Sequence, residues 1–77
     1  MDTLYSPDGW AQKHIRKMVA DGQPKDTSIR ELMTLTGASA DTVHHVLGHM
    51  QSMNEIEVKG SYLGTNLKDR FEIRKVG

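Results

Sequence analysis

The amino-acid sequence predicts an α+β fold in which three helices are followed by a two-stranded β-hairpin. Between residues 7 and 53, apolar residues recur every three or four positions, the spacing of one helix face, and residues typical of helix ends interrupt the pattern. After residue 54 the apolar residues alternate with charged ones, which is typical of half-buried strands. We expect a single domain over residues 1–77, because a chain this short buries one modest core.

The first helix is predicted for about residues 7–21. Ser6, Pro7 and Asp8 supply an N-cap, a proline at the first helical position and an acid in the first turn. Gly22 and Pro24 are typical of the segment after a helix end. The predicted core positions of this helix are Ala11, Ile15, Met18 and Val19.

Trp10 lies beside these core positions and has two interpretations. With Leu4 and Tyr5 it could form an apolar surface for a partner. A tryptophan next to a core stripe is more often part of the core, and we interpret Trp10 in this way.

Two further helices are predicted for about residues 29–36 and 40–53, joined by a short turn. Ser28 and Glu31 form a capping-box pattern, in which each side chain binds a backbone N–H of the first turn. Gly37 allows the left-handed conformation that ends a helix, and Ser39 with Asp41 starts the next one. The predicted core positions of the two helices are Ile29, Leu32, Met33, Leu35, Val43, Val46, Leu47, Met50 and Met53.

The hairpin is predicted for about residues 55–76. Ile56 and Val58 alternate with charged residues, as do Phe71 and Ile73, and the residues 60–66 between the two runs are typical of a loop. Residues 23–27 are polar and too few for a strand there to be predicted or excluded.

The segment SIRELMTLTGASADTVHHVLGHM resembles the helix-turn-helix of bacterial winged-helix regulators of the GntR and MarR types. In this resemblance Leu32 and Val43 match buried positions, Gly37 matches the turn, and Val46 matches the residue that packs the second helix back. The resemblance implies a winged helix-turn-helix fold, with residues 40–53 as the recognition helix in a DNA major groove and the hairpin as a wing. It also implies a small double-stranded DNA-binding protein, a transcriptional regulator or a phage or plasmid accessory factor.

The candidate DNA contacts are polar residues of the recognition helix and cations of the wing and the preceding helix. The recognition helix contains no arginine or lysine, so we expect modest base discrimination, with most affinity coming from phosphate contacts by the wing. If the histidines face phosphates, their protonation near pH 6 would strengthen binding. The candidates are Ser39, Thr42, His44, His45, His49, Arg30, Lys59, Lys68, Arg70 and Arg74.

The charge distribution leaves an alternative function open. The formal net charge is zero, with five basic and eight acidic residues in 1–58 and five basic and two acidic residues in 59–77. The basic C-terminal part favours DNA, whereas overall neutrality and an acidic first part favour a winged-helix module that binds a protein instead. Dimerisation or cooperative binding is expected in the first case, because one small module buries only about 600–1,000 Å² on DNA.

Several other classes of protein are not indicated. There is no cysteine, no membrane-length apolar run and no signal-peptide pattern, so we expect a cytoplasmic protein. His45 and His49, four residues apart, could reach one metal ion with His14 or Asp41 as a third ligand, but exposed polar histidines are the simpler interpretation. No catalytic motif, cofactor site or small-molecule effector pocket is predicted.

Overall fold

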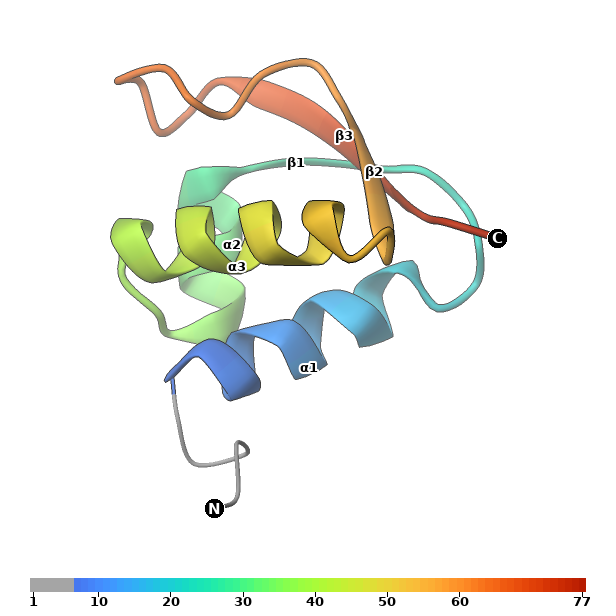
Figure 1. Ribbon diagram of the computed structural model, residues 1–77. Helices are drawn as coiled ribbons and strands as arrows, with labels where there is room; N and C mark the ends of the chain where they lie inside the picture. The colour runs from blue at the N-terminus through green and yellow to red at the C-terminus, as the bar shows by residue number, and fades with distance from the viewer. Residues whose placement is uncertain (1–6) are drawn as a thin grey trace.

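The computed structural model describes residues 7–77, which form three helices and a three-stranded antiparallel sheet (Figure 1). The elements are α1 (Pro7–Val19), β1 (Lys25–Ser28), α2 (Ile29–Thr36), α3 (Ala40–Ser52), β2 (Ile56–Lys59) and β3 (Arg70–Lys75). The predicted α+β class is confirmed. The sheet has one more strand than predicted, because β1 lies in the connector that the sequence left unassigned.

β3 is the central strand of the sheet, whose order is β1-β3-β2. Ile73 is opposite Lys25 of β1 on one side and Val58 of β2 on the other, and both pairings are antiparallel. Phe71 and Ile73 are buried, whereas the residues that alternate with them lie on the outer face of the sheet. The helices therefore cover one face of the sheet and leave the other exposed (Figure 1).

α1 begins at Pro7 and ends at Val19, two residues before the predicted end. The backbone N–H of Gly22 donates to the Val19 carbonyl over 3.0 Å, and Gly22 has a φ of 78°, so the chain leaves the helix through a left-handed turn. The predicted N-cap Ser6 lies outside the described residues, as do Leu4 and Tyr5.

Only half of the predicted capping box is present at the start of α2. The Ser28 hydroxyl accepts a hydrogen bond from the Glu31 backbone N–H at 3.2 Å. The Glu31 carboxylate does not return to Ser28, because it accepts instead from the Thr27 hydroxyl at 3.3 Å and from the Arg70 guanidinium. A side chain from β3 thus replaces the local contact that the sequence predicted.

The turn between α2 and α3 has the predicted form. Gly37 adopts a φ of 73°, and its N–H donates to the Met33 carbonyl over 2.8 Å. Ser39 is the N-cap of α3 and accepts from the Thr42 backbone N–H at 3.2 Å. These hydrogen bonds join residues only three or four positions apart, and they fix the turn between α2 and α3.

The core lies between the helices and the sheet, and the sequence predicted most of it. Leu35 and Met53 are wrong predictions, since they are 48% and 62% exposed. α2 faces the core through Ile29, Leu32 and Thr36, which places Leu35 to one side, and Met53 follows the last residue of α3. The buried apolar residues are Ala11, Ile15, Val19, Ile29, Leu32, Val43, Val46, Leu47, Met50, Ile56, Phe71 and Ile73.

The buried Thr36 replaces Leu35 in the core without leaving its hydroxyl unpaired. The hydroxyl donates to the Leu32 carbonyl over 2.7 Å and accepts from the Ala38 N–H at 3.1 Å. Trp10 is a further wrong prediction, because it is 45% exposed and belongs to the surface of α1.

A bidentate ion pair joins α1 to the residue that precedes β2. The Arg16 guanidinium donates to the two Glu55 carboxylate oxygens over 2.7 and 2.8 Å. The hydrogen bonds from Arg16 hold the pKa of Glu55 below its ordinary value, and those to Glu55 raise the pKa of Arg16. A carboxyl with a depressed pKa in the folded state stabilises the fold above its ordinary pKa and loses that contribution as the pH falls.

We therefore expect the free energy of unfolding to decline on acidification partly through Glu55. Glu55→Gln should lower stability by about 0.2–1 kcal/mol at pH 7, the range for solvent-exposed ion pairs, and should flatten the decline below the ordinary carboxyl range. Urea unfolding between pH 7 and 3 measures both effects. Glu72→Gln removes a carboxyl without an ion pair in residues 7–77 and is the control; an equal flattening in this variant would contradict the assignment to Glu55.

Candidate nucleic-acid interface

α3 presents a polar face that neither the other helices nor the sheet covers. Its exposed side consists of neutral residues, one acid and a glycine, and α3 contains no arginine or lysine. Of the predicted contacts, Ser39, His45 and His49 are exposed, and Thr42 and His44 are half-buried. The Thr42 hydroxyl is 3.1 Å from that of Ser39, within the cap of the helix. The remaining exposed residues of this face are Asp41, Gly48 and Ser52.

The three histidines of α3 lie in different surroundings. His45 Nε2 is 3.3 Å from a carboxylate oxygen of Asp8, which lies in the first turn of α1. The ring of His44 is 5.8 Å from that of Tyr62, and its Nε2 atom is buried without a hydrogen-bond partner among residues 7–77. His49 is exposed on the last turn of α3.

Tyr62 attaches the loop 60–69 to α3. Its ring packs between the rings of His44 and Phe71, at 5.8 and 5.4 Å, and its hydroxyl donates to the Gln51 side chain. A Cβ atom placed on Gly48 would be 4.0 Å from the same hydroxyl. The loop therefore lies along one side of the polar face of α3, and burial raises the pKa of Tyr62.

Tyr62 is not predicted as a site residue from the sequence, because it lies in a segment typical of loops. An aromatic residue among glycine, serine and asparagine is the only signal for it in the sequence, and that signal does not say which element it contacts. The next residue, Leu63, is 77% exposed at the tip of the loop.

Arg70, one of the predicted phosphate contacts, is bound by two carboxylates. Its guanidinium donates to the Asp26 carboxylate over 3.1 and 3.2 Å, to the Asp26 carbonyl over 3.3 Å and to the Glu31 carboxylate. These hydrogen bonds raise the pKa of Arg70, with Glu31 the larger contributor. Arg70 contributes one positive charge to this cluster, and Asp26 and Glu31 contribute two negative ones. The cluster is therefore net negative and does not attract a phosphate.

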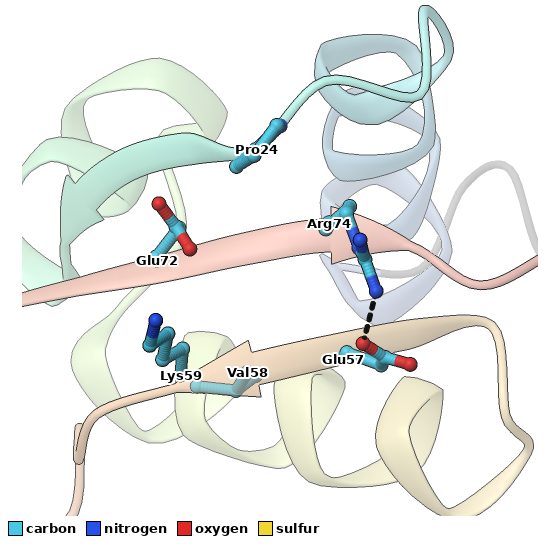
Figure 2. Close-up of a pocket in the computed structure, with 6 residues that line it drawn as sticks. All are labelled: Pro24, Glu57, Val58, Lys59, Glu72 and Arg74. Atoms are coloured by element: carbon cyan, nitrogen blue, oxygen red, sulfur yellow. Dashed lines mark hydrogen bonds and ion pairs between the residues drawn. The ribbon is translucent and has the colours of Figure 1, made fainter.

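Arg74 is also paired, on the outer face of the sheet. Its guanidinium donates to the Glu57 carboxylate over 2.6 Å, and Figure 2 shows this pair beside Lys59 and Glu72. These four residues line a groove of about 340 Å³ together with Val58 and Pro24. Positive and negative charges balance there, so the outer face is not a basic surface.

Arg30 and Lys68, by contrast, are exposed cations on neighbouring stretches of the backbone. The Arg30 backbone N–H donates to the Leu67 carbonyl over 3.0 Å, which places the first turn of α2 against the second half of the loop. Neither side chain forms an ion pair within residues 7–77. Lys59, at the other end of the loop, forms none either, although it is opposite Glu72 in the pairing of β2 with β3. The structure thus divides the predicted cations into paired (Arg70 and Arg74) and unpaired (Arg30, Lys59 and Lys68).

No described group of residues suits a metal ion. Residues 7–77 contain no cluster of three or more histidine, cysteine, aspartate or glutamate side chains that could hold one, and His45 faces Asp8 instead of His49. Within the same residues no helix has the length and apolar character needed to cross a membrane. Comparisons of the chain with protein-family models, curated proteins and solved structures found no match.

We expect Gly48→Ala to stabilise the protein. Glycine inside a helix costs about 0.5–1 kcal/mol relative to alanine, and the added methyl group meets only an ordinary contact with the Tyr62 hydroxyl. Thermal unfolding of the two proteins measures the difference. A loss of stability in Gly48→Ala would show that the Tyr62 hydroxyl lies closer to Gly48 than the 4.0 Å contact allows.

Tyr62 can be tested as the attachment of the loop to α3. Tyr62→Ala removes the ring contacts and should speed hydrogen exchange of the amides in residues 60–69, while the amides of α1 keep their protection. Tyr62→Phe keeps the rings together and should cost only about 1 kcal/mol for the lost hydrogen bond. If both variants exchange like the unmodified protein, another contact holds the loop.

Proposed function

We propose that this chain is a winged-helix domain that binds duplex DNA, with α3 in the major groove and the loop 60–69 as the wing. The observation that carries the proposal is the contact of Tyr62 with α3, which places the loop beside the polar face of that helix. The element order supports it, because the paired strands β2 and β3 follow α3 along the chain, as the resemblance implies for a wing. The resemblance of residues 28–50 to the GntR and MarR motifs supports the same assignment.

The face of α3 suits contact with a groove more than strong base discrimination. Gly48 lies in the middle of the exposed side, so the helix backbone can approach another surface closely. His45 and Ser39 can accept or donate hydrogen bonds to base edges, and Asp41 can accept from a cytosine amino group. The absence of arginine and lysine means that no bidentate guanine contact comes from this helix.

Phosphate contacts are assigned to Arg30, Lys59 and Lys68. They are exposed, form no ion pair within residues 7–77, and lie at the first turn of α2 and at the two ends of the loop. Three such contacts would give a salt dependence with a slope of about −3, since each neutralised phosphate contributes about −0.9. This is a modest affinity, consistent with a domain that binds DNA as a dimer or with a second factor.

A second candidate function is a winged-helix module that binds a protein. The carboxylates around Arg70 and Arg74 favour it, because they remove the basic character of the sheet that phosphate binding would use. The alternative predicts no salt-dependent binding of duplex DNA.

The decisive measurement is a fluorescence-anisotropy titration of a short labelled duplex at several low salt concentrations. The double variant Arg30→Gln and Lys68→Gln should bind several-fold more weakly and reduce the salt slope by about 2. The matched variant Lys13→Gln and Lys17→Gln removes the same charge from α1 and should leave the slope unchanged. No binding at low salt, or equal changes in the two variants, would refute the proposal.

A further inference from the structure

α1 carries a row of four side chains that takes no part in the proposed DNA interface. Trp10, Lys13, His14 and Lys17 are spaced three and four residues apart, so they lie along one side of the helix. We refer to these four residues as the α1 stripe.

The α1 stripe lies on the side of the helix away from α3. Asp8 and Arg16 mark the opposite flank, where they contact His45 and Glu55 at 3.3 and 2.7 Å. Successive residues of an α-helix are rotated by about 100° about its axis. The α1 stripe and the flank with Asp8 and Arg16 are therefore separated by well over a quarter turn. In Figure 1, no described helix or strand lies on the far side of α1 from the sheet.

The stripe combines an exposed aromatic ring with unpaired cations. Trp10 is 45% exposed, although an indole ring is among the largest apolar groups that a protein can bury. The Lys13 ammonium is 5.4 Å from the centre of this ring, and His14 meets the ring edge-on at 4.9 Å. Neither Lys13 nor Lys17 has an acidic partner among residues 7–77, in contrast to the paired Arg16 on the other flank.

We infer that the α1 stripe binds an acidic protein segment that carries apolar side chains. Lys13 and Lys17 are one helical turn apart, about 6 Å along the axis, and would pair with two carboxylates of the segment. Trp10 would cover an apolar side chain next to them, in the manner of an aromatic anchor surrounded by charges. Charge complementarity identifies the partner as acidic, and the inference does not depend on DNA binding.

Two other occupants fit the stripe less well. A nucleobase stacks on an aromatic face, but the Lys13 ammonium lies over one face of the Trp10 ring and His14 occupies part of its edge. A second copy of this chain offers no matching acidic row, because the carboxylates without an ion pair in residues 7–77 lie on three separate elements. These carboxylates are Asp41 in α3, Asp69 in the loop and Glu72 in β3.

The only tryptophan of the chain provides a direct measurement. A synthetic peptide in which glutamate alternates with leucine and phenylalanine should shift the Trp10 emission to the blue, and the same peptide with glutamine in place of glutamate should not. The double variant Lys13→Glu and Lys17→Glu should weaken binding by about tenfold, equivalent to about 1.4 kcal/mol. The charge-matched variant Lys59→Glu and Lys68→Glu should change it by less than about twofold. Far-ultraviolet circular dichroism checks that both variants fold.

Trp10→Ala completes the test, with anisotropy of a labelled peptide as the readout. It should weaken binding while lowering the thermal unfolding midpoint only modestly, because Trp10 is 45% exposed and lies outside the buried core. Three results would overturn the inference: no blue shift with the acidic peptide, equal losses in the two lysine variants, or an equal shift with a single-stranded oligonucleotide of the same charge. A blue shift that grows with protein concentration alone would assign the stripe to self-association and would also overturn it.

Discussion

The pairing of β3 with both β1 and β2 holds the two halves of the chain together. β1 and β2 do not pair with each other, so β3 alone joins the segment before α2 to the segment after α3. Its buried residues Phe71 and Ile73 face the helices, and Phe71 also contacts Tyr62. The same strand that completes the core therefore fixes both ends of the loop 60–69, one end against α3 and the other against the first turn of α2.

The sheet also decides which charges remain available for binding. Five of the ten basic residues lie in the last 19 residues of the chain, which suggests a basic C-terminal surface. Antiparallel pairing brings Asp26 and Glu57 next to Arg70 and Arg74, and Glu31 reaches Arg70 from α2. The cations that form no ion pair within residues 7–77 lie mainly on two surfaces, the α2-and-loop side and the outer side of α1. They are Arg30, Lys59 and Lys68 on the first, Lys13 and Lys17 on the second, and Lys75 at the end of β3. This division is why we propose DNA as the ligand of one surface and an acidic protein segment as the ligand of the other.

The prediction errors share one physical cause. Gly37, Ser39 and the Ser28 hydroxyl behave as predicted, because their hydrogen bonds reach only three or four residues along the chain. The Glu31 carboxylate and Leu35 do not behave as predicted, because their surroundings depend on how α2 is oriented relative to β3 and the core. The roles of Arg70 and Tyr62 in the candidate interface depend on contacts with residues 9 or more positions away along the chain. Composition and periodicity carry no information about such contacts.

The approximate positions of the helices, the turn at Gly37 and most of the core could be predicted from the sequence, since caps, glycine conformation and apolar spacing act locally. The strand at residues 25–28 could not be predicted in this way, because an edge strand this short is stabilised by its partner β3 and has little pattern of its own. The fold also leaves Trp10 exposed and pairs Arg70 and Arg74 with carboxylates. Burial and ion pairing are properties of residues brought together from distant parts of the chain, and the fold alone brings them together.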